Sequence, residues 1–202
     1  MERDAIIPRF HTFVVAAALL AVSFPGPAAA QKQGGILRVH VIDSPPSVSM
    51  HEEAAPEPAR AVMGIFNNLV MFDQHVNQNN FRSIVSDLAT GWSWSEDGTQ
   101  LTFRLRDGVK WHDGRPFTAK DVQCTWDLLL GKSQEKLRIN PRKAWYQNVE
   151  AVAADADLTA TFHLKRPQPA LIALLASGYS VVYPCHVPPA EMRQHPIGTG
   201  PF

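Results

Sequence analysis

Between residues 101 and 106 the chain alternates strictly between apolar and polar side chains. The apolar positions are Leu101, Phe103 and Leu105, and Thr102, Arg104 and Arg106 separate them. A period of two is typical of a β-strand with one buried face. Turns bracket this strand, because glycine reaches positive φ without steric cost. They are Glu96-Asp97-Gly98 before the strand, Asp107-Gly108 after it, and Asp113-Gly114 a little further on.

A helix is predicted to follow these turns. Thr118 has the character of an N-cap, and Asp121 stands three residues later, as in a capping box. Val122, Trp126 and Leu129 then recur at helical spacing, so they form one apolar stripe. We expect this stripe to be buried.

Shorter patterns predict the remaining elements. Expected strands cover residues 36–42, 149–153, 158–164 and 180–183, and the middle two form a hairpin around Asp155-Ala156-Asp157. Expected helices cover residues 59–66 and a segment that starts at Pro169 and buries Leu171, Leu174 and Leu175. Prolines cluster between these segments and indicate irregular connections.

The first thirty residues have the pattern of a secretory leader. Arg3 and Arg9 precede an apolar run over 13–24, and Ala28-Ala29-Ala30 offers a small-residue cleavage site. A membrane anchor is the alternative, but a bilayer needs roughly twenty apolar residues. Gln31, and not a cysteine, follows the site, so we expect no lipid anchor. The sequence therefore predicts a signal peptide over 1–30 and a periplasmic protein cleaved after Ala30.

Charge and composition narrow the function classes. The chain has 19 Lys and Arg against 19 Asp and Glu, so its formal net charge is zero. That balance favours neither nucleic acid nor an anionic membrane as a partner. Its 202 residues, 45% of them hydrophobic, are enough for one sizeable globular core.

The segment 86–127 also resembles a signature of the family 5 extracytoplasmic solute-binding proteins, the peptide and nickel receptors of bacterial ABC importers. The matching positions are Asp87-Leu88-Ala89, Trp92, Glu96-Asp97-Gly98, Phe103, Leu105-Arg106, Val109-Lys110, His112-Asp113-Gly114, Ala119 and Asp121-Val122. Two further blocks, 67–73 upstream and 196–202 (PIGTGPF) downstream, resemble other segments of that family.

This resemblance implies an α/β fold of the type II periplasmic-binding-protein kind, with a mixed sheet and an added α/β subdomain. Residues 31–58 would begin the main lobe, 59–195 would form the subdomain of the first lobe, and 196–202 would start the return to the main lobe. Family members continue through a second lobe, so the resemblance implies that this chain is an amino-terminal fragment holding part of the first lobe only.

Three stretches would face the ligand cleft by the same resemblance. They contain Glu52 and Glu53, then Trp145 and Tyr146, then Ser177, Gly178 and Tyr179. A glutamate would meet a ligand ammonium group, Trp145 would stack on a ligand side chain, and Gly178 would let the backbone approach closely. The alternatives are ordinary ones, in which the aromatic residues belong to the core and the glutamates to a solvated loop.

The resemblance implies a monomeric periplasmic receptor that delivers oligopeptides to an inner-membrane ABC permease, without a cofactor and without catalysis. A secreted enzyme or a protein that handles nickel chelates is the alternative. Ser133 and Lys136 satisfy the SxxK pattern of penicillin-recognising enzymes, but no KTG or SDN element accompanies them. The histidines never recur at the i, i+4 spacing that presents two imidazoles to one metal ion, so we expect no metal site.

Cys124 and Cys185 are the only cysteines. The periplasm oxidises thiols, so a bridge between them is one possibility. In the other, Cys124 simply packs beside the apolar stripe of the predicted helix, and the sequence leaves both open.

Overall fold

The computed structural model describes residues 38, 40, 46–54, 56 and 62–202. The chain divides into two compact units, 1–38 and 39–202, and every described helix and strand lies in the second. The predicted leader and most of the predicted strand 36–42 lie outside the described residues. Residues 59–61 of the predicted helix 59–66 also lie outside them. The described part of that segment is helical only at Val62 and continues as a turn over 63–65, closed by the bond from the amide of Ile65 to the carbonyl of Val62, so the helix does not reach Phe66 as predicted. The domain boundaries at 30, 58 and 195 stay predictions.

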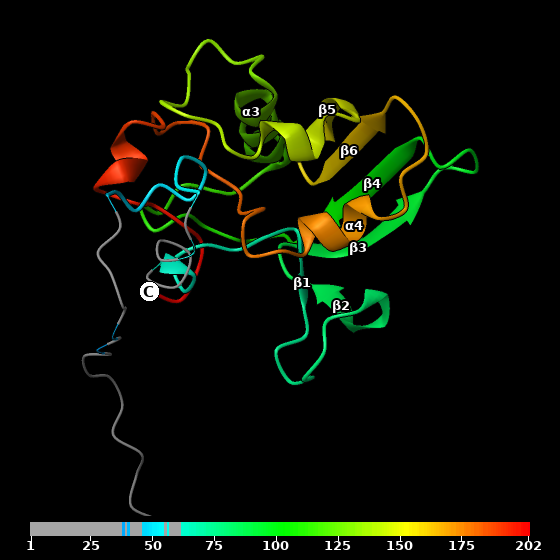
Figure 1. Ribbon diagram of the computed structural model, residues 1–202, viewed down its shortest axis with the longest axis horizontal. Coiled ribbons are helices and arrows are strands. Elements are labelled where there is room, and N and C mark those ends of the chain that lie inside the picture. The colour runs from blue at the N-terminus through cyan, green and yellow to red at the C-terminus, as the bar shows by residue number, and fades with distance from the viewer. Residues whose placement is uncertain (1–37, 39, 41–45, 55, 57–61) are drawn as a thin grey trace, which may run out of the picture. The chain divides into compact units, whose positions relative to one another are not determined.

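A four-stranded sheet forms the centre of the second unit, in the order β3-β4-β6-β5. The strands are β3 (Ala89–Trp94), β4 (Gln100–Leu105), β5 (Val149–Ala156) and β6 (Thr159–Leu164). A separate pair joins β1 (Val70–Phe72) to β2 (Ile84–Ser86), and Figure 1 shows it beyond the edge of the larger sheet. Every pairing among the described strands is antiparallel.

The alternating segment is the strand β4, as predicted. Leu101 and Phe103 have no exposed surface and Leu105 is buried, while the side chains between them are less buried. Phe103 meets Phe162 of β6 edge to face, with ring centroids 5.6 Å apart. One face of the sheet therefore supplies the core.

The predicted helix is α3 (Ala119–Leu130), which lies against β5 and β6 in Figure 1. Thr118 and Asp121 form the capping box, and Gly131 ends the helix with a φ of 76°. Trp126 is fully buried and meets Phe162 edge to face at a centroid distance of 4.8 Å. The predicted stripe is confirmed, since Val122 and Leu129 are also fully buried.

The hairpin near residue 157 is confirmed, but β5 runs to Ala156 and the turn lies at 157–158. The helix after Pro169 is α4 (Leu171–Leu175), so the proline lies in the turn before the helix. Leu174 is only partly buried, and Ile172 takes its place in the core.

One predicted strand was wrong, and one strand was missed. Residues 180–183 do not form a strand, because only Val181 makes a bridge, to Asn68, while the hydroxyl of Ser180 and the amide of Tyr183 bind other parts of the chain. The edge strand β3 was not predicted, since its sequence, ATGWSW, lacks β-branched residues apart from one threonine and contains Gly91.

In the described part of the chain, three short 3-10 helices connect these elements: η2 (Phe81–Ser83), η3 (Lys143–Tyr146) and η4 (Glu191–Arg193). A disulfide joins Cys124 of α3 to Cys185, whose Cα atoms are 5.6 Å apart. No helix in the described part of the chain is long and apolar enough to cross a bilayer.

Candidate ligand-binding surface

The segment 47–53 is a buried turn held by its own backbone and by distant side chains. The amides of Glu52 and Glu53 both donate to the carbonyl of Ser49, at 3.2 and 3.1 Å. Glu52 has no exposed surface and Glu53 is 6% exposed, so these residues do not form a solvated loop. A buried carboxylate needs partners, and arginines supply them here.

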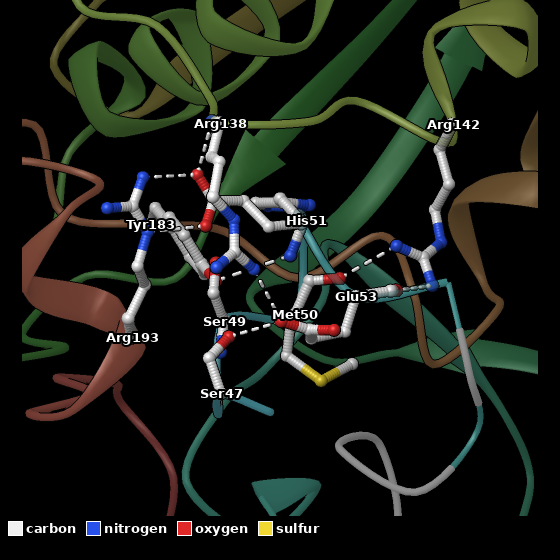
Figure 2. Close-up of polar contacts among 10 residues, drawn as sticks. Ser47, Ser49, Met50, His51, Glu53, Arg138, Arg142, Tyr183 and Arg193 are labelled. Carbon is white, nitrogen blue, oxygen red and sulfur yellow. Dashed lines mark hydrogen bonds and ion pairs between the residues drawn. The ribbon is translucent and has the colours of Figure 1, made fainter. Parts of the chain in front are cut away.

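Arg193 neutralises Glu52 and Arg138 neutralises Glu53. Figure 2 shows both arginines at the buried turn. Arg193 binds Glu52 with two donors, Nε to Oε2 at 2.6 Å and Nη2 to Oε1 at 2.8 Å, and the amide of Arg138 donates to Oε1 at 2.6 Å. Burial opposes ionisation of Glu52, but these bonds and both arginine charges outweigh it and hold the pKa of the carboxyl below its usual value. Arg138 Nη2 also donates to Glu53 Oε1 at 3.0 Å.

His51 and Tyr183 form the inner wall of the same turn. The imidazole is fully buried, its Nε2 lies 3.0 Å from the carbonyl oxygen of Val181, and its ring centroid lies 4.3 Å from that of Tyr183. Burial, together with the charge of Arg142, lowers the pKa of His51 to about 3. His51 is therefore neutral at physiological pH and acts as a packing group in this place.

Arg142 joins this turn to the predicted aromatic residues. Its Nη1 donates to the carbonyl of Met50 at 2.8 Å and its Nη2 donates to the carbonyl of Glu53 at 2.7 Å (Figure 2). Its Cζ lies 4.2 Å from the ring centroid of Tyr179 and 5.6 Å from that of Trp145. Burial lowers the pKa of Arg142, yet the group remains a cation at neutral pH.

These side chains border an open pocket of about 270 Å³, which we call the Arg142 pocket. Its lining residues are Ala54, Pro141, Arg142, Trp145 and Tyr179. Trp145 is 41% exposed, and its ring meets that of Tyr179 at right angles, with centroids 5.9 Å apart. The pocket thus combines a buried cation with accessible aromatic surface.

The structure brings some of the predicted site residues together and separates others. Trp145 and Tyr179 meet at the Arg142 pocket, and the carbonyl of Glu53 accepts a hydrogen bond from Arg142 without lining the pocket. Tyr146 is a core residue, because it is fully buried against Trp126 and its hydroxyl lies 2.8 Å from Ser180 Oγ. That a ligand contacts the glutamates stays a prediction.

Ser177 and Gly178 lie beside this pocket without lining it. Ser177 Oγ donates to the carbonyl of Leu174 at 2.7 Å, so the hydroxyl serves the local turn. A Cβ placed on Gly178 would meet nothing within 4 Å. The close backbone approach that the glycine suggested is therefore not made within the described chain.

Sequence reasoning missed the three arginines that organise this region, Arg138, Arg142 and Arg193. The sequence did contain a signal for Arg142. It stands three residues before Trp145, a spacing at which the guanidinium can contact the indole ring in a cation–π interaction. The glutamates gave no indication of their partners, because Arg193 is 141 residues away from Glu52 along the chain.

The residues behind the two alternative hypotheses, the SxxK motif and a histidine metal site, have the following surroundings. Lys136 Nζ donates to the carbonyls of Gly131 and Ser133, where it covers the end of α3. Within the described ranges, no three His, Cys, Asp or Glu side chains gather as a metal site would require. The exposed His112 contacts the carbonyl of Gly200 at 2.8 Å through Nε2.

Comparison with known proteins decides the family. Residues 83–202 match the model of the bacterial extracellular solute-binding proteins, family 5. The chain belongs to this family. A Brucella ovis protein, provisionally named an ABC transporter peptide-binding protein, is 32% identical over 148 residues, which are 68% of this chain and 26% of the relative.

Other family 5 proteins agree with this assignment. The dipeptide-binding protein of Escherichia coli is 29% identical over 159 residues, which cover 68% of this chain and 29% of the length of that protein. The periplasmic binding protein DppA of Helicobacter pylori, solved with the peptide STSA, superposes with a TM-score of 0.65 at 25% identity, covering 77% of this chain and 34% of DppA. The fold is thus a part of the type II periplasmic-binding-protein architecture, and the chain spans about a quarter to a third of these relatives.

Proposed function

We propose that this protein is the periplasmic substrate-binding component of an ABC importer that takes up oligopeptides. The ligand lies between two lobes of the complete protein, and the region described here supplies one wall of that cleft. The protein binds and releases its ligand without changing it. An inner-membrane permease is its partner.

The Arg142 pocket is the observation that carries this proposal. Residues from three separate stretches meet there: Ala54 after the buried turn, Trp145 of η3, and Tyr179 after α4. An accessible aromatic pair beside a polar group suits ligands whose side chains vary, because stacking tolerates many partners while the polar group fixes orientation.

The buried turn explains how such a wall is kept in place. Glu52 is fixed by Arg193 and Glu53 by Arg138, and Arg142 holds the backbone carbonyls of the same turn. A preorganised wall lowers the entropy that a flexible peptide and its receptor lose together on binding. The names of the relatives, which include dipeptide- and peptide-binding proteins, support peptides as the ligand class.

Calorimetric titration of the protein produced from its complete reading frame tests the proposal. A mixed pool of di- to pentapeptides should bind saturably in the micromolar range or below. Trp145→Ala should weaken binding by roughly tenfold, since stacking of an aromatic ring on a ligand side chain contributes about 1 kcal/mol or more. Trp94→Ala, on the edge strand β3, is the matched control and should bind as the parent does. A protein that binds none of the pool would contradict the proposal.

A further inference from the structure

Three lysines from separate parts of the chain line one open pocket of about 490 Å³, which we call the lysine pocket. Lys132 follows α3, Lys143 begins η3, and Lys165 follows β6. All three residues are exposed. Because the chain as a whole has no formal net charge, this gathering is a local excess of positive charge that the composition does not explain.

Carboxylates in the described part of the chain do not neutralise these lysines. The ion pairs found there are made by Arg115, Arg138, His186 and Arg193. Burial raises the pKa of Asp127 and the charge of Lys132 opposes that rise, yet this carboxylate does not line the pocket. Among the described residues that do line it, Glu150 is the only acidic one, so the pocket has three cations against one anion.

Backbone carbonyls hold two of the ammonium groups beside the start of β5. Lys132 Nζ donates to the carbonyl of Glu150, and Lys165 Nζ donates to the carbonyl of Gln147 at 2.8 Å. An ammonium has three N–H donors, so each of these groups keeps two that the described bonds do not use. The ammonium of Lys143 has no hydrogen-bond partner within the described residues. The pocket therefore offers unused donors as well as charge.

The chemistry of the lining decides which kind of anion fits. Leu130 and Val149 supply its apolar part, and Gln147 adds an amide group. An ammonium binds oxyanions as a point charge, without the planar fork of a guanidinium. Several such charges around one space suit an anion whose charged oxygens point in different directions, as those of a phosphate group do.

We propose that the lysine pocket binds a phosphate group, at a site separate from the Arg142 pocket. The two pockets share no lining residue. The inference goes beyond the proposed function, because peptide binding neither requires nor supplies such a site. The phosphate group comes either from a free phosphate compound or from the headgroup of an anionic phospholipid.

Two probes distinguish these sources, and both use the complete gene product. Calorimetric titration with inorganic pyrophosphate tests the free compound, and co-sedimentation with vesicles of phosphatidylcholine, with or without phosphatidylglycerol, tests the headgroup. At low ionic strength at least one probe should bind saturably, and added salt should weaken that binding because it screens exposed charges. The probe that binds identifies the source, and binding of both shows that the pocket accepts either.

Lys143→Gln tests the pocket with little risk to the fold, since no described contact depends on its ammonium. It should weaken binding about threefold, and the double variant Lys143→Gln, Lys165→Gln about tenfold, because single exposed charges contribute little. Lys110→Gln removes the same charge from an exposed position elsewhere and is the matched control. It should change the affinity by less than about twofold.

Glu150→Gln gives a test in the opposite direction, which loss of folding cannot imitate. The change removes the one acidic side chain among the described lining residues and should strengthen binding about threefold. Glu96→Gln removes a negative charge from an exposed turn elsewhere and should leave the affinity unchanged.

Three results would overturn the inference. Failure of both probes to bind at low ionic strength would remove the site. Lysine and Glu150 variants that bind the probe as their controls do would place the binding elsewhere. Titration with the peptide pool separates this inference from the proposed function, because the lysine-pocket variants should bind peptides as the parent does. A loss of peptide affinity as large as the loss for the phosphate probe would contradict a separate site.

Discussion

Asp121 of α3 binds the backbone at Cys185: its Oδ1 accepts the amide proton of that cysteine at 2.8 Å. Its other oxygen, Oδ2, accepts from the amide of Thr118 at 2.9 Å and closes the capping box. One buried carboxylate therefore orders the start of a helix and a segment 64 residues downstream. The disulfide from Cys124 to Cys185 fixes the same junction a second time.

Asp121→Ala should destabilise the folded chain by about 2–4 kcal/mol, because it removes a helix cap and leaves the Cys185 amide without its acceptor. The midpoint of urea unfolding measures this loss. Glu96→Ala, an exposed acidic residue in the turn before β4, should change the midpoint little. Equal midpoints for the two variants would contradict the role given to Asp121.

Reduction of the disulfide should cost about 4 kcal/mol, since the bridge closes a loop of 61 residues and restricts the unfolded chain. Urea unfolding with and without dithiothreitol measures the difference. The double variant Cys124→Ser, Cys185→Ser should unfold like the reduced protein and should not respond to the reductant. A parent protein whose midpoint ignores dithiothreitol would show that the bridge does not stabilise the fold.

Trp126→Ala should cost on the order of 3–5 kcal/mol, as large truncations in cores do, because Trp126 is fully buried between Phe162 and Tyr146. Trp145→Ala, the same change at a residue that is 41% exposed, should cost about 1 kcal/mol or less. Comparing the two midpoints in urea separates a core tryptophan from a surface one. The expectation fails if the order is reversed.

Acid should weaken the fold before the carboxylates titrate, because of His51. Its pKa is about 3 in the folded chain against 6.5 normally, so between these pH values the imidazole is protonated in the unfolded chain and neutral in the folded chain. Stability from this group is complete above pH 6.5 and falls as the pH drops from 6.5 toward 3, by at most about 1.4 kcal/mol per pH unit. Glu52, whose folded pKa is depressed, contributes a further loss only below about pH 4.5.

Urea unfolding between pH 7 and 5 isolates the histidine, since Glu52 remains ionised there. His51→Gln should be less stable than the parent at pH 7 and should lose less stability on acidification. The exposed His112→Gln serves as the control. Parallel pH profiles for the parent and His51→Gln would contradict a buried neutral imidazole.

Cleavage after Ala30 should give a mature chain that begins at Gln31, because small residues at 28 and 30 suit the signal peptidase. Intact-mass analysis of the periplasmic fraction measures the terminus. A species that keeps the apolar run 13–24 and sediments with membranes would show that the segment is an anchor.

Local patterns predicted those parts of the fold that neighbouring residues determine. The strand β4, the capping box at Thr118, the Trp126 stripe and the β5–β6 hairpin all follow from spacing and turn chemistry. The edge strand β3 was missed because Ala89 and Gly91 interrupt its strand-forming residues, and its register depends on the partner β4.

The candidate site was harder to predict because distant contacts create it. The resemblance placed Trp145 and Tyr179 on the same cleft, and their rings do meet, but the sequence analysis did not identify the cation beside them, Arg142. For Glu52 and Glu53 the sequence left two interpretations open, contact with a ligand ammonium group or a solvated loop, because charged residues are mostly exposed. Only the tertiary structure reveals the arginines that permit their burial.

The contact between Glu52 and Arg193 also sets an order of events during folding. The two residues are 141 positions apart, so the contact closes only when both ends of that long span have come together. Until then the carboxylate of Glu52 stays hydrated, because a lone buried carboxylate would be unstable. Closure of the buried turn is therefore a late folding event of high contact order.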